Sequence, residues 1–479
     1  MARGECSTFL LPTPDSRLPT PDSRLPTPDS RLADGFSIFK KCVAVPIPPR
    51  SFAFSPRLPI MLGDHCGLVA PSPPASPTPV STPSMFDETH NFFIGESLPT
   101  FDYDPRTRVV FGAGVLSRLG ELARMQGGRE VLLVSDPGIR QVGHEARALH
   151  VHEATGLRVH IFDEHLPNPT TDDVDRGAAF AIGKEIDLLI GLGGGSSMDL
   201  AKGINFLLTN GGKMEDYQGT GHARHPMLPL IAIPTTSGTG SEAQSYCVIS
   251  DAKTHMKMAC GDKKAAARVA LLDPELSVTM PASVTAVTGI DAISHAVESY
   301  VTKAHNPVSM LFARRAWNLL CRAFPLVLKE PTNLSARGAM LLGAHLAGAA
   351  IENSMLGATH ALANPLSAHF GMIHGNAIAV LLPHVVRYNS SVVGTQYGRL
   401  AEDAKLCDRH DPEAGDLLAL YLRNLATKAG CPSTLAGCEG VAELLPTLAG
   451  EAALQWTGKF NPRDVDASSL LELYRCALP

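Results

Sequence analysis

Four apolar runs of strand length alternate with helical segments in the first half of the chain. They lie at 130–136, 158–163, 186–192 and 227–233, and each leads into a turn or loop rich in Gly, Pro, Asn or Thr. Strands that are apolar on both sides are typical of a parallel sheet whose two faces are covered by helices. The pattern therefore predicts an α/β domain with a parallel sheet over residues 91–280.

The hydrophobic pattern changes after about residue 281, where strand patterns nearly vanish. The segment 288–298 is apolar-rich and free of proline, which favours a helix. Further helical segments are predicted at 308–328, 336–350, from 363 onward, 415–429 and 468–476. An all-helical C-terminal domain over residues 281–479 is therefore expected to follow the sheet.

The first 90 residues differ from both domains. Residues 11–32 repeat Leu-Pro-Thr-Pro-Asp-Ser-Arg three times, and residues 70–84 are rich in Pro, Ser and Thr. Such segments bury too little apolar surface to offset chain entropy, so residues 1–90 are predicted to form a disordered extension. It is a recruitment or linker segment, a passive tail, or the product of a start codon assigned too early, with Met85 the true beginning. No basic stretch precedes an apolar one, which argues against a secretory signal.

Composition excludes several classes of partner. The formal charge of -6 gives no reason to expect nucleic acid or an anionic membrane surface. No run approaches the ~18 consecutive apolar residues of a membrane helix. Ten cysteines without regular spacing indicate free thiols in a reducing compartment, so a cytoplasmic protein is expected.

A glycine-rich loop follows the third predicted strand. Residues 193–202 read Gly-Gly-Gly-Ser-Ser-Met-Asp-Leu-Ala-Lys and open a helix. Glycines let the backbone approach a pyrophosphate, and the helix N-terminus offers unpaired N–H groups. The alternative is a tight turn that only packs the helix on the sheet. In the standard dinucleotide fingerprint the ribose-binding acid follows the glycines by ~20 residues, whereas here Asp136 precedes them. The loop therefore predicts a nucleotide sheet of a different plan.

Asp136 stands at the end of a predicted strand, where a carboxylate would bind a ribose diol and repel a 2′-phosphate. This favours NAD over NADP. The alternative is an aspartate that only starts the Asp-Pro-Gly turn. Thr235, Thr236 and Thr239 could bind phosphate or ribose, or serve as turn residues beside a helix cap at Ser241.

Asp291 and His295 are four residues apart on a predicted helix, which places both side chains on one face. Such a pair also arises by chance or as a surface hydrogen bond. His360 and His374 add two imidazoles in small-residue surroundings. One carboxylate and three imidazoles suit Fe²⁺ or Zn²⁺ and leave positions for a substrate oxygen.

These motifs together resemble the iron-containing (group III) alcohol dehydrogenases, which have the dehydroquinate synthase-like fold. The resemblance runs from about Phe101 to residue 479 and rests on 193–202, 234–242, 288–298 and 357–375. It implies a divalent metal, with iron as the expected ion, and a homo-oligomer. The implied metal ligands are Asp291, His295, His360 and His374. The implied contacts to the nicotinamide cofactor are Asp136, Asn168, Gly194, Gly195, Ser196, Asp199, Thr235, Thr236, Thr239 and Lys257. From its own surroundings in the sequence, Lys257 would be taken for a solvated charge.

Two positions depart from the family pattern. The family often has a second histidine, credited with proton relay, where this chain has Asn364, and a proline where it has Ile373. The first departure affects the proton path and the substrate range. His369 could relay protons instead, although a helix-surface histidine is the simpler interpretation. His345 is expected in the core or an interface.

The expected reaction follows from these parts. A primary alcohol held by the metal would lose its hydroxyl proton near neutral pH and pass a hydride to C4 of NAD⁺ in an interdomain cleft. Rival functions are a hydroxyacid–oxoacid transhydrogenase of the same family, a lyase or synthase of the same fold, and a non-catalytic NAD- or metal-binding protein.

Overall fold

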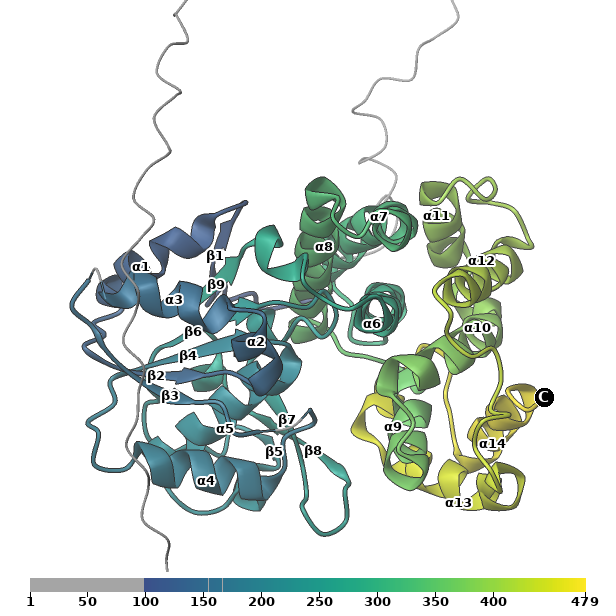
Figure 1. The fold of residues 1–479 in the computed structure, drawn as a ribbon. Helices are drawn as coiled ribbons and strands as arrows, with labels where there is room; N and C mark the ends of the chain where they lie inside the picture. The colour runs from purple at the N-terminus through teal and green to yellow at the C-terminus, as the bar shows by residue number, and fades with distance from the viewer. Residues whose placement is uncertain (1–98, 154, 166) are drawn as a thin grey trace, which may run out of the picture. The chain divides into compact units, whose positions relative to one another are not determined.

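The computed structural model describes residues 99–479 except 154 and 166 (Figure 1). The proline-rich repeat and the extension predicted at 1–90 lie outside the described residues.

The N-terminal part is built on a six-stranded sheet in the order β1-β9-β6-β4-β2-β3. Every neighbouring pair of strands is parallel. The strands are β1 (Arg108–Phe111), β2 (Glu130–Val134), β3 (Arg158–Phe162), β4 (Leu188–Gly193), β6 (Leu230–Pro234) and β9 (Val269–Leu272). The predicted parallel α/β sheet is confirmed, and β2, β3, β4 and β6 correspond to the four predicted apolar runs.

Helices cover both faces of this sheet because successive strand residues point to opposite sides. Leu132 and Val134 of β2 join a core cluster with residues of α4 and α5. Val131 and Leu133 of the same strand join another cluster with residues of α1 and α3. The helices are α1 (Leu119–Met125), α2 (Pro137–Gln141), α3 (His144–Glu153), α4 (Thr171–Ala181) and α5 (Gly195–Asn210).

A second, smaller sheet stands beside the main one. Strands β7 (Tyr246–Ser250) and β8 (Lys257–Gly261) form an antiparallel hairpin, and β5 (Gly219–Thr220) pairs with β8. The sequence pattern did not predict this sheet, because its strands are short and mix polar with apolar residues. The hairpin matters for the site, since it carries Tyr246 and Lys257.

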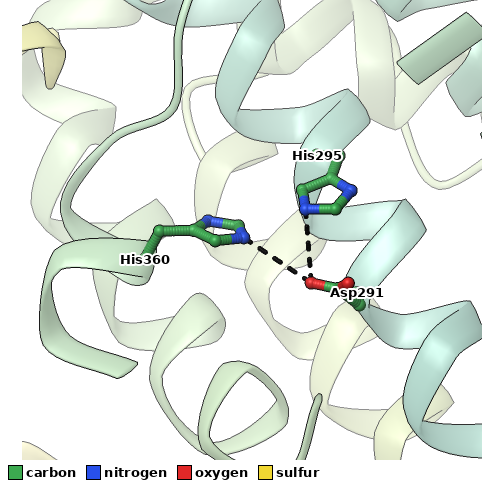
Figure 2. Close-up of side chains that lie close together, drawn as sticks. All are labelled: Asp291, His295 and His360. Atoms are coloured by element: carbon green, nitrogen blue, oxygen red, sulfur yellow. Dashed lines mark ion pairs between the residues drawn. The ribbon is translucent and has the colours of Figure 1, made fainter. Parts of the chain in front are cut away.

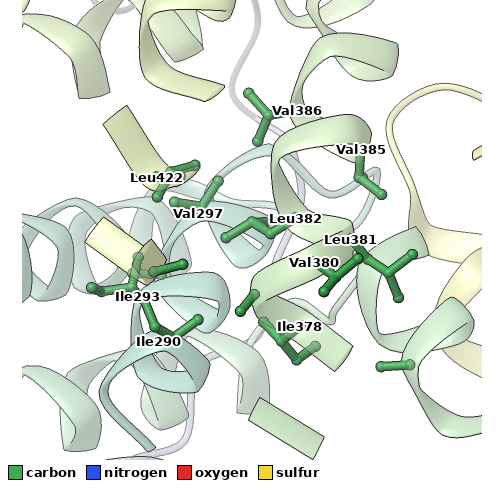
Figure 3. Packing of buried hydrophobic residues seen from close by; sticks show 14 of the residues in the cluster. Ile290, Ile293, Val297, Ile378, Val380, Leu381, Leu382, Val385, Val386 and Leu422 are labelled. Carbon is green, nitrogen blue, oxygen red and sulfur yellow. The ribbon is translucent and has the colours of Figure 1, made fainter. Parts of the chain in front are cut away.

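The C-terminal part is helical, and no strand occurs between residues 282 and 479. Its helices are α6 (Ala282–Val301), α7 (Pro307–Lys329), α8 (Leu334–Glu352), α9 (Ala358–Phe370), α10 (His374–Val393), α11 (Thr395–Asp403), α12 (Ala414–Lys428), α13 (Val441–Leu454) and α14 (Ala467–Cys476). Helix α6 packs against α7, α8 and α10. Its apolar residues, among them Ile290, Ile293 and Val297, lie beside Leu382 of α10 and Leu422 of α12 (Figure 3). Burial on nearly all sides holds α6, and therefore Asp291 and His295, in a rigid frame.

Helix α9 begins at Ala358, whereas the pattern predicted a start at 363. The difference has a physical reason, because distant side chains bind the first backbone N–H groups of the helix. Ala358 N donates to Asn461 Oδ1 at 3.2 Å, and Thr359 N donates to Glu298 Oε1 at 2.8 Å. These partners replace a local N-cap, so the start of the helix leaves no mark in the neighbouring sequence.

Helix α8 has the length and apolar composition that a membrane-spanning helix needs, and within residues 99–479 it alone does. Two thirds of it (67%) is buried inside the protein, as is usual for a core helix.

Candidate metal centre and cofactor cleft

Helix α6 presents Asp291 and His295 to the same point. The two side chains are one turn apart, and His295 Nε2 lies 3.3 Å from Asp291 Oδ1. Both residues are buried, with 6% and 5% of their surface exposed. Burial therefore excludes the alternative interpretation of this pair as a surface hydrogen bond.

Two further imidazoles reach Asp291 from other helices. His360, in the first turn of α9, places Nε2 at 3.5 Å from Asp291 Oδ1 (Figure 2). His374, the first residue of α10, places Nε2 at 3.8 Å from the same oxygen and is more exposed than the others. Three helices thus bring all four predicted ligands around one carboxylate oxygen.

The cluster fits a divalent metal ion. Asp291 Oδ1 and His360 Nε2 are buried and have no hydrogen-bond partner in the described part of the chain. Leaving such atoms unpaired is costly, so a ligand is expected to satisfy them. Candidate ligand atoms of Asp291, His295 and His360 all lie within 4.8 Å of one another. A carboxylate with imidazoles is a donor set for Fe²⁺ or Zn²⁺.

The electrostatics of the cluster also suit a cation. Burial would raise the pKa of Asp291, but His295, His360 and His374 outweigh it and hold that pKa below its usual range. Burial lowers the pKa of His295 and of His374, and Lys257 lowers that of His374 further. Burial acts in the same direction on His360, yet the carboxylates of Asp291 and Glu298 overcome it and raise that pKa to about 9. A metal at His360 Nε2 would take the place of this proton.

Glu298 contacts His360 and the start of helix α9, and the sequence analysis assigned it no role. Its Oε2 lies 2.6 Å from His360 Nδ1, and its Oε1 accepts from Thr359 N. Because Nδ1 is engaged, His360 turns Nε2 toward Asp291. A signal was present in the sequence, since Asp291, His295 and Glu298 have the helical spacing i, i+4, i+7.

The glycine loop opens helix α5 directly after β4, as predicted. Gly194 is the extended N-cap, and Gly195 is the first helical residue. A Cβ on Gly195 would lie 2.6 Å from Thr239 Cγ2, and one on Gly194 would lie 3.4 Å from Thr236 Cγ2. Glycine is therefore needed for the close approach of the two loops that follow β4 and β6. Thr235 joins them through its backbone N–H, which donates to Gly193 O at 2.8 Å.

A cavity of about 190 Å³ joins the metal cluster to this loop. All four predicted metal ligands line it. Of the predicted cofactor contacts, those that also line it are Asn168, Gly195, Ser196, Asp199, Thr239 and Lys257. The four that do not line it, Asp136, Gly194, Thr235 and Thr236, follow the carboxyl ends of β2, β4 and β6.

Asp136 caps the turn that follows β2. Its Oδ1 accepts hydrogen bonds from Gly138 N and Ile139 N at 2.9 and 3.1 Å. Its Oδ2 accepts from Ser197 Oγ at 3.2 Å, which ties it to the glycine loop. The interpretation as a turn-starting residue is confirmed, and the ribose contact stays a prediction.

Hydrogen bonds hold several of the residues that line the cavity in place. Asn168 has a left-handed backbone, with φ of 59°, and its N–H donates to Ser196 Oγ at 3.1 Å. Asp199 accepts from Ser241 Oγ at 2.6 Å, and burial raises its pKa. The Lys257 ammonium group makes no hydrogen bond or ion pair with another described residue, and burial lowers its pKa. A partly enclosed lysine of this kind is available for an anionic or hydroxyl-bearing ligand.

His369 and His345, the two other histidines that the sequence analysis considered, lie outside the cluster. His369 Nε2 lies 2.8 Å from Glu451 Oε2 at the surface, which confirms the interpretation as a helix-surface histidine. His345 is buried with Glu242, with 3.3 Å between Nδ1 and Oε1.

Asn364 lines the cavity, and its amide donates to Gln455 Oε1 at 3.0 Å. At the position of the usual histidine, this chain therefore has an amide engaged with the segment that follows α13.

Comparison with known proteins agrees with this geometry. Residues 105–274 match the family model described as iron-containing alcohol dehydrogenase, and residues 285–478 match the C-terminal model of the same family. The chain belongs to the iron-containing alcohol dehydrogenase family. It is 34% identical over 382 residues to the 1,3-propanediol dehydrogenase of Klebsiella pneumoniae, covering 79% of this chain and 98% of that protein. It is 33% identical over 372 residues to the NAD-dependent methanol dehydrogenase of Bacillus methanolicus, covering 77% and 97%.

A solved structure also supports the assignment of this chain to the family. The crystal structure of a 1,3-propanediol oxidoreductase superposes with a TM-score of 0.76 at 33% identity, covering 79% of this chain and 100% of that one. The predicted family, fold and enzyme class, a metal-dependent alcohol dehydrogenase, are confirmed. The relatives are named as dehydrogenases, which does not favour the transhydrogenase or the non-catalytic alternative.

Proposed function

We propose that this protein interconverts primary alcohols and aldehydes by hydride transfer to and from NAD, with Fe²⁺ bound by Asp291, His295, His360 and His374. The observation that carries the proposal is the shared cavity. One enclosed space is lined both by an unsatisfied carboxylate–imidazole cluster and by a glycine loop at a helix N-terminus. A metal-activated alcohol and a nicotinamide need such neighbouring sites.

The residues divide the work. A bound divalent metal would supply Lewis acidity, which lowers the pKa of an alcohol hydroxyl. Asp291 contributes the negative charge that balances the ion, and Glu298 holds His360 in the required tautomer. The unpaired backbone N–H groups at the start of α5 suit a pyrophosphate. Ile351, Met355 and Leu356 give the cavity an apolar side that excludes water from the reacting carbon.

The choice of ion and cofactor is part of the proposal. Fe²⁺ is supported by the family description, although Zn²⁺ would accept the same ligands. NAD rather than NADP is supported by Asp136, whose carboxylate would repel a 2′-phosphate, and by the relative whose name includes NAD dependence. A cytoplasmic location and self-association as a homo-oligomer stay predictions, as does the absence of nucleic-acid and membrane partners.

The direct test is NAD⁺ reduction by a panel of alcohols, with protein purified without air and reloaded with Fe²⁺ or Zn²⁺. We expect NADH to form only in the metal-loaded protein and fastest with Fe²⁺. Hydride exchange between a hydroxy acid and an oxo acid, without NADH release, would replace the proposal by the transhydrogenase. If neither NADH formation nor hydride exchange is detected, catalysis by this site is contradicted.

A further inference from the structure

Two cavities meet at a pair of stacked aromatic rings. The inner cavity, about 190 Å³, contains the metal cluster, and the outer one, about 580 Å³, lies beyond the β7–β8 hairpin. Tyr246 and Trp456 line both cavities. Their ring centroids are 5.8 Å apart, and their planes differ by 18°. The pair therefore forms part of the wall between the two spaces.

Tyr246 is the anchored member of the pair. Its carbonyl oxygen accepts a hydrogen bond from the buried Lys202 Nζ at 2.7 Å. Its hydroxyl lies 3.0 Å from Thr220 Oγ1 on β5 of the same small sheet. Its ring covers Gly261, where a Cβ would approach the ring to 2.3 Å. Contacts at the backbone, the ring and the hydroxyl leave this side chain little freedom.

Trp456 is held less firmly. It is the first residue of the short 3-10 helix η7 (Trp456–Phe460), and the residue before it, Gln455, has an extended backbone. Its indole N–H makes no hydrogen bond within the described residues, and its ring stacks on Tyr246. Leu454, two residues earlier, is 83% exposed. The Trp456 ring is therefore held by fewer polar contacts than that of Tyr246.

We propose that the Tyr246–Trp456 pair is a movable wall that sets the chain length of the alcohol substrate. With the rings stacked, the inner cavity accepts short primary alcohols. When the Trp456 ring moves aside, the tail of a longer primary alcohol passes into the outer cavity while its hydroxyl stays at the metal cluster. This inference rests on the proposed function, since it specifies the substrate range of the same site.

The outer cavity has an apolar side that suits such a tail, beside polar residues that include Glu215, Asp251 and Lys257. Met256, Met258 and Leu454 offer flexible apolar contacts, and methionine adapts well to chains of varying shape. Each methylene that leaves water for an apolar surface strengthens binding, so a wall that blocks the passage removes this gain for long chains. Chain-length preference should therefore depend on the aromatic pair rather than on the metal ligands.

The test compares primary alcohols from 1-propanol to 1-octanol with the metal-loaded enzyme. Trp456→Ala should raise kcat/KM for 1-octanol relative to 1-propanol by about tenfold or more, since one to a few methylenes account for such a ratio. Trp456→Phe keeps an aromatic wall and should keep the chain-length profile of the natural protein. Leu420→Ala, at an exposed position on α12, is the remote control and should change neither rate. An unchanged profile in Trp456→Ala would overturn the proposal.

A binding measurement separates this inference from the proposed function. The protein has two tryptophans, and the other, Trp317, is fully buried and donates to Leu400 O. The fluorescence difference between the natural protein and Trp456→Phe therefore reports on Trp456. We expect 1-octanol, but not 1-propanol, to change this difference signal. If no alcohol is oxidised, the proposed function fails. If 1-octanol does not change the fluorescence difference, the movable wall is overturned.

Discussion

His360 Nδ1 lies 2.6 Å from Glu298 Oε2, and this contact decides which imidazole nitrogen faces Asp291. The same carboxylate accepts the Thr359 N–H, so one buried side chain fixes both the ring and the first turn of the helix that carries it. Second-layer carboxylates of this kind orient histidine ligands and raise their basicity.

Glu298→Gln should therefore weaken metal binding about 10- to 100-fold, because the amide is a poorer partner for His360 Nδ1. Competition with a chelator of known affinity measures the change. Glu451→Gln is the matched control, since Glu451 holds the surface residue His369 and should leave metal affinity unchanged. Equal affinities for the two variants would remove Glu298 from this role.

His360→Ala should abolish turnover while NAD binding survives. The variant loses one buried ligand of the cluster, whereas the glycine loop and Thr239 are untouched. The rate of NADH formation and a fluorescence titration with NADH give the two readouts. Activity close to that of the natural protein would refute the metal assignment.

Asp136→Asn should lower the preference for NAD over NADP by about tenfold, equivalent to about 1.4 kcal/mol. The amide oxygen can still accept from Gly138 N and Ile139 N, so the cap of α2 survives while the charge is lost. The ratio of kcat/KM for the two cofactors is the measurement. If the ratio does not change, Asp136 serves the turn alone.

Gly195→Ala should raise KM for NAD about tenfold, because the new methyl group displaces either Thr239 or the start of α5. The comparison is Gly450→Ala on α13, where the methyl group would meet nothing within 4 Å. That change should leave the kinetics intact and stabilise the fold by about 0.5–1 kcal/mol, measured by urea unfolding. Equal KM values for both variants would contradict a cofactor site at the loop.

Lys202→Met should lower the free energy of unfolding by about 3 kcal/mol or more. The ammonium group is fully buried and donates to Ser241 O, Ser241 Oγ, Gln244 O and Tyr246 O at 2.7–2.9 Å. Burial lowers the pKa of Lys202, while Asp199 opposes this shift. Removing the donor breaks all of these buried hydrogen bonds, and urea unfolding monitors the loss. A change below about 0.5 kcal/mol, as is usual for surface substitutions, would contradict this role.

The features that the sequence predicted are those set by local periodicity. The i, i+4 spacing of Asp291 and His295 holds because a helix determines their separation. The apolar strands and the glycine loop depend likewise on neighbouring residues. Trp456 reaches the cavity from a distant part of the chain, and the start of α9 depends on Glu298 and Asn461. Such long-range contacts have no period, so a single sequence does not reveal them.

The contacts of helix α9 also bear on the order in which the metal site forms during synthesis. Tyr474 Oη donates to Leu362 O of α9 at 2.6 Å, across 112 positions of sequence, and Asn461 Oδ1 accepts the Ala358 N–H of the same helix. On the ribosome, all four metal ligands emerge before these partners exist. We therefore expect helix α9 to reach its final position only after translation has passed Tyr474. Metal capture is consequently expected late in maturation, when the ion would enter a nearly finished fold rather than serve as the nucleus around which the helices assemble.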